Sequence, residues 1–293
     1  MVWLIGNNGM LGHDVESALK KNGLEYQATD LDTDITDLQA LKQYIKDKRI
    51  DFIINCAAYT NVDGAEEEQE RAEAVNAGAV RNISLVAKES NAVLIHISTD
   101  YVFNGSKKDP YTEKDSTDPL GFYGKSKLKG EEAVQELLQK YFIIRTAWLY
   151  GPNGKNFVHT MLRLFNEHKE IKVVNDQYGS PSYTVDLADI IIKVIKENKT
   201  AYGIYHFSNE GKTTWHEFAL EIYKQALENG LLKKERNIKI IPVNTEDYPT
   251  VARRPQNSLL SKEKLKKTLG IEVRDWSDAL KEFIVSIKKR EEI

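Results

Sequence analysis

The sequence contains a single cysteine, Cys56, so no disulfide can form within the chain. A lone thiol inside an apolar run fits a protein of a reducing compartment. The apolar runs are all far shorter than a membrane span, and no basic leader with a cleavage site precedes the first apolar segment. We therefore expect a soluble cytoplasmic protein with no membrane segment.

An excess of charge of one sign is also missing. The 41 basic and 44 acidic side chains leave a net charge of −3, which argues against nucleic acid or an anionic membrane as a partner. The six histidines are scattered without the spacing of metal ligands, so we expect no metal site. No nucleophile-elbow motif surrounds Ser98, which argues against a hydrolase. The acidic run Glu66-Glu67-Glu68 is interpreted as an exposed helix start.

A glycine-rich turn is the first positive signal for a function. An apolar strand at residues 2–5 runs directly into Gly6, Gly9 and Gly12, and an apolar helical pattern begins at Leu11. Glycines let the backbone approach a phosphate, and a helix N-terminus offers free N–H groups and a positive dipole end. The pattern predicts a dinucleotide site, NADPH or NADH; the alternative is a tight turn that binds nothing.

Strands and helices alternate along the first half of the chain. Apolar runs predict strands at 2–5, 24–28, 51–60, 93–100 and 141–146, with helices between them, including one over 69–89. This order predicts an α/β fold, a Rossmann-type doubly wound parallel sheet with a smaller mixed α/β substrate domain. We assign residues 1–147 to the cofactor domain, completed by a segment near 171–196, and residues 148–170 and 197–293 to the substrate domain.

Four aspartates follow the second predicted strand: Asp30, Asp32, Asp34 and Asp37. An acidic residue about 20 positions after the glycines commonly binds the adenosine ribose, and Asp30 is the best placed. Its carboxylate would repel a 2′-phosphate, which gives a mild preference for NADH over NADPH. The alternative is a solvated loop in which Asp37 caps the next helix.

Two Tyr-x-x-x-Lys pairs occur, Tyr44 with Lys48 and Tyr123 with Lys127. On a helix both members project from one face, and an ammonium beside a phenol is expected to lower the pKa of the phenol. Only the second pair follows the strand that ends in Ser98-Thr99-Asp100, at the sheet edge where the glycine turn also lies. We therefore predict that Tyr123 and Lys127 are catalytic and that Tyr44 and Lys48 form an ordinary helix surface.

The combined motifs resemble a known family. They are the turn at 6–12, Asn55-Cys56-Ala57-Ala58-Tyr59-Thr60, Ser98-Thr99-Asp100-Tyr101-Val102-Phe103 and Tyr123-Gly124-Lys125-Ser126-Lys127. Together they resemble the extended short-chain dehydrogenase/reductases that act on nucleotide sugars. The neighbourhoods of Trp148 and of Arg254-Pro255-Gln256-Asn257-Ser258 resemble those of dTDP-4-dehydrorhamnose reductases, and the resemblance covers nearly the whole chain.

The resemblance implies a reaction and a role for each matching residue. The chain would reduce dTDP-4-dehydro-β-L-rhamnose at C4 to dTDP-β-L-rhamnose. Tyr123 would protonate the C4 oxygen, Lys127 would lower the pKa of Tyr123 and hold the nicotinamide ribose, and Thr99 would hydrogen-bond the substrate oxygen. Other implied substrate-binding residues are Asp100, Trp148, Asn156 and Arg254. Implied cofactor-binding residues are Gly6, Gly9, Met10, Leu11, Gly12, Asp30, Asp34, Ile35, Ala58, Tyr59 and Thr60.

The same motifs are also compatible with other functions. The chain could be another nucleotide-sugar reductase, epimerase or dehydratase; Asp100 stands where dehydratases carry an acidic residue, but their Asp-Glu pair is missing. It could also be a non-catalytic NADP-binding subunit resembling the regulatory subunit of methionine adenosyltransferase. Some relatives bind magnesium at a dimer contact, and no acidic cluster maps onto such a site. The expected state is a monomer or a homodimer.

Overall fold

The fold is built on one parallel sheet. In the computed structural model, which describes residues 1–233 and 237–291, six strands lie in the order β10-β5-β4-β3-β1-β2. Their bounds are β1 (Val2–Ile5), β2 (Tyr26–Thr29), β3 (Phe52–Asn55), β4 (Val93–Thr99), β5 (Tyr141–Thr146) and β10 (Gly203–Phe207). Strand β2 lies on one side of β1 and β3 lies on the other, and both are parallel to it. The strand order therefore reverses between β1 and β3. The predicted doubly wound Rossmann fold is confirmed, and such a reversal leaves a crevice at the carboxyl ends of the strands.

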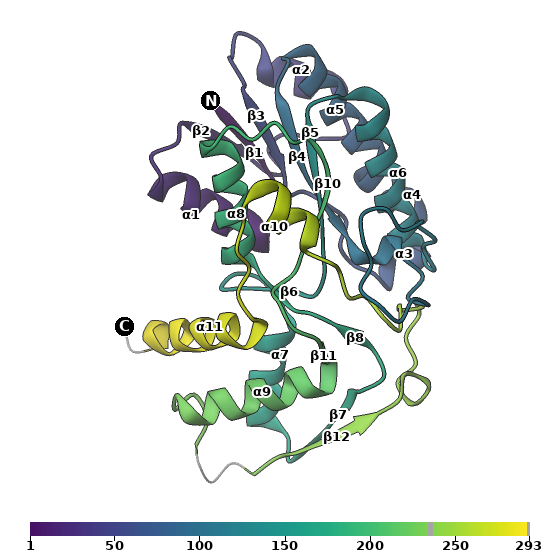
Figure 1. Cartoon of the computed structure of the whole chain (residues 1–293), viewed down its shortest axis with the longest axis vertical. Helices are drawn as coiled ribbons and strands as arrows, with labels where there is room; N and C mark the ends of the chain where they lie inside the picture. Colours follow the sequence, from purple (N-terminus) through teal and green to yellow (C-terminus); the bar gives the residue numbers. More distant parts are fainter. Residues whose placement is uncertain (234–236, 292–293) are drawn as a thin grey trace.

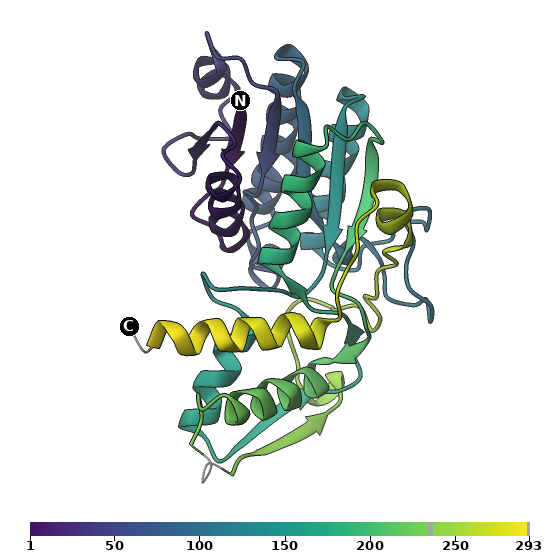
Figure 2. The same cartoon turned by 60° about the vertical axis from the view of Figure 1, so that its left-hand side comes forward.

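Helices cover both faces of this sheet (Figures 1 and 2). One face carries α1 (Met10–Lys21) and α8 (Thr184–Lys196); the other carries α2 (Leu38–Ile45), α5 (Ala79–Glu89) and α6 (Phe122–Leu137). Successive strand residues serve opposite cores: Leu4 packs under α1 and α8, whereas Trp3 and Ile5 pack under α2 and α5. Because both faces are buried, the strands are continuous apolar runs, which is why the sequence revealed them.

The helix predicted over residues 69–89 is interrupted. It consists of α4 (Gln69–Glu73), a π-helical turn (Ala74–Gly78) and α5. The turn carries Asn76, which is fully buried; its amide accepts from the Tyr59 N–H at 2.9 Å and donates to the Tyr59 carbonyl at 3.0 Å. The π turn therefore directs an amide onto the backbone of the segment that follows β3. A helical period in the sequence does not reveal such a turn.

A smaller lobe lies below the carboxyl edge of the sheet (Figure 2). Its own apolar core is formed around α7 (Phe157–Glu167), α9 (Trp215–Glu228) and α11 (Trp276–Glu291). Short strand pairs complete it: β7 (Glu170–Val174) with β12 (Lys239–Val243), β8 (Tyr178–Gly179) with β11 (Thr213–Thr214), and β6 (Leu149–Tyr150) with β9 (Ser182–Tyr183). The remaining helices are α3 (Gly64–Glu67), α10 (Glu263–Leu269) and 3-10 turns at Asp100–Val102 and Thr245–Asp247.

The expected domain boundaries differ from this arrangement in two places. Within the segment near 171–196, α8 does cover the main sheet, but β7 pairs with β12 in the smaller lobe. Within 197–293, β10 pairs with β5 at the edge of the main sheet, and α10 packs beside it. The sequence of a five-residue strand does not indicate which strand it pairs with, so β10 could not be assigned to a sheet from the sequence. Residues 234–236 and 292–293 of that range lie outside the described residues.

A buried ion pair joins α6 to the sheet. The Arg145 guanidinium on β5 donates to both carboxylate oxygens of Glu131 on α6, with Nη2 at 2.6 Å and Nε at 2.9 Å. The Ser98 hydroxyl on β4 donates to the same carboxylate. The Glu131 and Arg145 side chains are 0% and 3% exposed. The carboxylate is thus paired and hydrogen-bonded from two strands, which is the condition under which a buried charge is tolerated.

Removing Glu131 is expected to destabilise the fold strongly. Glu131→Ala leaves the Arg145 charge buried without its partner, and such losses cost about 3–5 kcal/mol. The matched control is Glu132→Ala, because Glu132 is the next residue of α6 and is exposed. Urea unfolding measures both. Equal free energies of unfolding for the two variants would contradict this account of the pair.

Candidate active site

The cavity at the carboxyl ends of the strands is the candidate active site. It has a volume of about 900 Å³ and is shared by the glycine turn, the ends of β3 and β4, the first turns of α6 and the segment after β5. Most of the sequence-predicted residues line it: Gly6, Gly9, Met10, Leu11, Asp30, Asp34, Ile35, Ala58, Tyr59, Thr60, Thr99, Asp100, Tyr123, Lys127 and Trp148. The fold therefore brings together residues that are far apart in the chain.

Two of the three glycines in the turn leave no room for a side chain. Gly6 has φ +82°, and a Cβ there would lie 2.7 Å from the Ala57 nitrogen. A Cβ on Gly12 would lie 2.0 Å from the Gly6 carbonyl oxygen, so Gly12 serves the packing of α1 against the turn and does not line the cavity. Gly9 caps α1 without a side chain, which leaves the first N–H groups of the helix available to an anion. These features fit the pyrophosphate of a dinucleotide.

The far end of the cavity is acidic. Asp30 directly follows β2, and Leu31, Thr33, Asp34 and Ile35 line the same end. The Asp34 carboxylate accepts from the Thr36 backbone at 2.9 Å and hydroxyl at 2.7 Å, and these bonds lower its pKa. The Asp34 carboxylate therefore stabilises the loop, and Asp30 lines the same end of the cavity.

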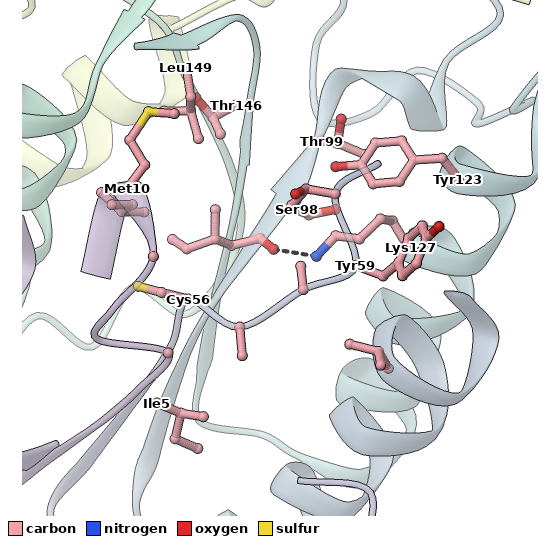
Figure 3. A pocket seen from close by; sticks show the side chains of 18 of the residues that line it. Ile5, Met10, Cys56, Tyr59, Ser98, Thr99, Tyr123, Lys127, Thr146 and Leu149 are labelled. Atoms are coloured by element: carbon pink, nitrogen blue, oxygen red, sulfur yellow. Dashed lines mark hydrogen bonds between the residues drawn. The ribbon is translucent and has the colours of Figure 1, made fainter. Parts of the chain in front are cut away.

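Tyr123 and Thr99 meet at the centre of the cavity. Tyr123 lies in the first turn of α6 and Thr99 ends β4, and Figure 3 shows the phenol beside the threonine. Burial raises the pKa of Tyr123 above its ordinary value; the hydrogen bond with Thr99 opposes this rise, and the charge of Asp100 adds to it. The net shift of the pKa of Tyr123 is therefore upward, opposite to the lowered pKa expected from the spacing of Tyr123 and Lys127. Tyr123 instead keeps its proton.

Lys127 lies one helical turn further along α6. Its Nζ donates to the Ile97 carbonyl at 2.7 Å, the dashed line in Figure 3, and the residue is 2% exposed. Burial lowers the pKa of Lys127 to about 8, and the charge of Glu131 opposes that shift. The spacing in the sequence correctly placed the lysine on the same helix face as Tyr123. The direction of its pKa shift depends on burial and on nearby charges, which are determined by the packing around it.

The second Tyr-x-x-x-Lys pair lies away from the cavity. The Lys48 ammonium lies 3.4 Å from the centre of the Tyr44 ring, and this ring stacks on Trp3 at 4.5 Å. The Tyr44 hydroxyl donates to the Gln27 side chain at 3.1 Å. Tyr44 therefore packs α2 onto the sheet and has no part in the site.

Asp100 is a buried carboxyl group on the cavity wall. It is 3% exposed, and its Oδ1 accepts from the Thr99 hydroxyl at 3.0 Å. Its Oδ2 is also buried, and the nearby Ser258 hydroxyl acts to lower the pKa of this carboxyl group. Burial raises the pKa of Asp100 to about 7, against the lowering effect of the Thr99 bond. A carboxyl group poised near neutrality in a cleft is typical of a functional site.

Trp148 is held in an uncommon backbone conformation. Its φ is +49°, and its ring stacks on Trp215 of α9 with centroids 3.6 Å apart. A Cβ on Gly179 would lie 2.6 Å from the indole, so only glycine leaves room for the ring. A tryptophan in the left-handed region is strained, and such strain concentrates at ligand sites. Trp148 lines the cavity as a ring held in place by Trp215 of the smaller lobe.

Two predicted substrate residues lie outside the cavity lining. The Asn156 side chain accepts from the His159 N–H at 3.1 Å and donates to the Gly151 carbonyl at 2.9 Å, so it caps α7. Arg254 donates to Asp63 at 3.0 Å. Neither contact was visible in the sequence, because a cap and a long-range ion pair depend on the local fold.

Several lining residues had not been predicted. Among them are Cys56, Val62, Arg71, Val75, Tyr101, Thr146, Leu149 and Lys155. Their position at the carboxyl end of β5 and in the segment that follows it could have indicated Thr146 and Leu149. Arg71 lies on α4 and Lys155 in the loop before α7, and only tertiary structure places their charges at the cavity.

A dinucleotide fits the residues present, since the bare glycine turn, the acidic end and the buried lysine occupy successive parts of one cavity. Within the described part of the chain, no group of three or more His, Cys, Asp or Glu side chains is arranged to hold a metal ion. No helix among residues 1–233 and 237–291 is long and apolar enough to cross a membrane.

The raised pKa of Asp100 predicts a pH-dependent stability. Between its ordinary value of 3.8 and about 7 the folded protein binds more protons than the unfolded chain, so the free energy of unfolding falls as pH rises through this window. Asp100→Asn removes that dependence. At about 1.4 kcal/mol per pKa unit, we expect the variant to be more stable than the parent by about 1–4 kcal/mol above the window. Urea unfolding across the pH range measures this difference, and a pH-independent difference would contradict it.

Comparison with known proteins agrees with this geometry. The family described as RmlD substrate binding domain matches residues 1–289. The dTDP-4-dehydrorhamnose reductase of Shigella flexneri is 38% identical over 290 residues, 97% of this chain and 96% of that protein. A solved dTDP-4-dehydrorhamnose reductase of Clostridium acetobutylicum is 41% identical with a TM-score of 0.92, over 98% of this chain and 99% of that one. The reductase of Bacillus anthracis, solved with NADP, is 39% identical with a TM-score of 0.91, over 97% of this chain and 98% of that one. The chain therefore belongs to the RmlD substrate binding domain family, as the resemblance to dTDP-4-dehydrorhamnose reductases had indicated.

Proposed function

We propose that the protein reduces dTDP-4-dehydro-β-L-rhamnose at C4 to dTDP-β-L-rhamnose with NADPH or NADH. The observation that carries the proposal is the meeting of Tyr123 and Thr99 in the cavity that the glycine turn also lines. A proton donor beside a dinucleotide cradle is the arrangement that carbonyl reduction needs. The relatives that share the whole chain are named as this reductase.

The cofactor supplies a hydride when it is bound, and the chain supplies the surroundings for that transfer. Gly6 and Gly9 accept the pyrophosphate at the start of α1, with Met10 and Leu11 in the first helical turn. Asp30 meets the adenosine ribose, and Ala58, Tyr59 and Thr60 line the middle of the cofactor. Asn76 supports this last segment by bonding both backbone groups of Tyr59.

Tyr123 donates the proton to the C4 oxygen. Its raised pKa keeps the phenol protonated until negative charge develops on the substrate oxygen, which then withdraws the proton. The Thr99 hydroxyl hydrogen-bonds the same oxygen and orients it. Lys127, with a pKa of about 8, is mainly charged at neutral pH and is the group available for the nicotinamide ribose. Its charge would then ease the loss of the phenol proton during the reaction.

The sugar pocket is formed from both lobes. Asp100 lies beside Thr99 where the sugar would bind, and Trp148 supplies an apolar wall. Asn156 contributes indirectly, because it holds the Gly151 carbonyl and the start of α7. Arg254 could hold the substrate diphosphate by bidentate pairing, which would require it to leave Asp63. We place the enzyme in the cytoplasm, as a monomer or homodimer.

A dehydratase is the alternative with a specific observation in its favour. Asp100 has a pKa near 7 and touches Thr99, so it could exchange a proton with a substrate. A dehydratase or epimerase returns its cofactor to the starting oxidation state, whereas a reductase releases it oxidised. Net oxidation of cofactor therefore separates these enzymes.

The direct test is an assay of NADPH and NADH oxidation with dTDP-4-dehydro-β-L-rhamnose, alongside other dTDP- and UDP-linked 4-keto sugars. We expect stoichiometric oxidation of at least one cofactor with this substrate. No oxidation with either cofactor would contradict the proposal. Capture of a stoichiometric protein partner without any turnover would favour a regulatory subunit instead.

Loss of the phenol should stop the chemistry and spare the binding. Tyr123→Phe removes the donated proton, so kcat is expected to fall by about 10²–10⁴-fold while cofactor affinity changes little. Tyr44→Phe is the matched control, since it removes a hydroxyl far from the cavity. Steady-state assays and fluorescence titration with NADPH measure the two effects. A Tyr123→Phe variant with parental kcat would rule out the assignment of the proton donor.

A further inference from the structure

The N-terminus of the catalytic helix lacks a cap of its own. The N-cap residue of α6 is Gly121, which has no side chain to bond the first N–H groups of the helix. Tyr123 is the second residue of that helix, so its position depends on how firmly the first turn is formed. A loose first turn would let the phenol move relative to Thr99.

The missing cap comes from a different part of the chain. The Glu66 carboxylate on α3 accepts from the Phe122 N–H at 2.7 Å, across 56 residues of sequence. Phe122 is the first residue of α6 and directly precedes Tyr123. A carboxylate at this point satisfies a helix N–H and also meets the positive end of the helix dipole.

The space around Gly121 is adapted to this carboxylate. Gly121 has an extended backbone, with φ −116°, that any residue could adopt. A Cβ there would nevertheless lie 2.5 Å from the Glu66 Oε1. A side chain at position 121 would therefore displace the Glu66 carboxylate from the place where it accepts from Phe122.

The segment that carries Glu66 also lines the cofactor end of the site. It runs from Ala57 through Thr60, which line the cavity, into α3. Asp63 in the same segment accepts from the Ala252 N–H and from Arg254, both at 3.0 Å, and so joins it to the smaller lobe. Figure 1 shows α3 beside α4 and α6, at the edge where the C-terminal segment passes. One short segment therefore contacts the cofactor cradle, the proton-donor helix and the substrate lobe.

We propose that Glu66 is a positioning residue for Tyr123: its carboxylate caps α6 from outside the helix and holds the turn that carries the proton donor against the cofactor-lining segment. The proposal rests on the proposed function for its kinetic consequence, but the cap itself can be measured without a substrate. The acidic run at 66–68 is then only partly an exposed helix start. Glu67 and Glu68 are exposed, whereas Glu66 turns inward to α6.

The test compares three single variants and one double variant. Glu66→Ala removes the acceptor, Glu66→Gln keeps an oxygen acceptor, and Gly121→Ala pushes the carboxylate away while leaving Glu66 in place. We expect Glu66→Ala and Gly121→Ala each to lower kcat by about 10- to 100-fold, with KM for the nucleotide sugar and affinity for NADPH little changed. Glu66→Gln is expected to retain most of the parental kcat. Glu70→Ala, an exposed carboxylate on α4, is the control and should behave as the parent.

The double variant separates a shared contact from two unrelated defects. Once Glu66 is alanine, the extra methyl at position 121 has room, so Glu66→Ala combined with Gly121→Ala should be no worse than the poorer single variant. Multiplied losses in the double variant would overturn the proposal. So would a parental kcat in Glu66→Ala.

Hydrogen exchange on the protein without substrate reads the cap directly. The Phe122 amide should exchange faster in Glu66→Ala than in the parent and in Glu70→Ala, and should stay protected in Glu66→Gln. Unchanged exchange at Phe122 in Glu66→Ala would overturn the cap whatever the activity. An inactive parent protein would instead reject the proposed function, and the exchange result would still decide whether Glu66 holds the turn.

Discussion

The geometry of the site depends on the buried contact between Glu131 and Arg145. Glu131 lies on α6 four residues after Lys127, Arg145 lies on β5, and the Ser98 hydroxyl of β4 joins them. The contact therefore fixes the helix of Tyr123 and Lys127 to the strand that ends in Thr99 and to the strand that leads to Trp148. An ion pair suits this task because two desolvated charges tolerate little displacement. Apolar packing alone would leave the helix freer to shift along the sheet.

Burial controls the protonation of the site more than the nearness of opposite charges does. It raises the pKa of Tyr123, raises the pKa of Asp100 to about 7 and lowers the pKa of Lys127 to about 8. In each case the charged form is the one that loses water. The result is a donor that keeps its proton and two neighbours that titrate close to neutral pH. Asp100 and Lys127 can therefore exchange protons near neutral pH at little cost, which fits a site for proton transfer.

The fold and most of the cavity could be predicted from the sequence, for identifiable reasons. Strands buried on both faces are apolar runs, and the glycine turn follows the first of them, so the sheet and the cofactor end were visible in the pattern. Predictions failed where partners lie far apart in the chain. The pairing of the edge strand β10 with β5 and the ion pair of Arg254 with Asp63 both depend on contacts that no local period encodes. The π turn at Asn76 was hidden in the same way inside a regular helical pattern.

The sequence by itself indicated the class of fold, the glycine turn and the candidate pair of Tyr123 and Lys127. Each of these depends on short-range spacing or on a motif. Two identical Tyr-x-x-x-Lys spacings show the limit of that information, since only one lies in the cavity. Tertiary structure alone decided the direction of the pKa shift of Tyr123, the left-handed backbone conformation of Trp148 and the contact of Glu66 with α6. The physical reason is the same for all three. Desolvation, steric room and capping across 56 residues are properties of the surroundings that folding creates around a residue.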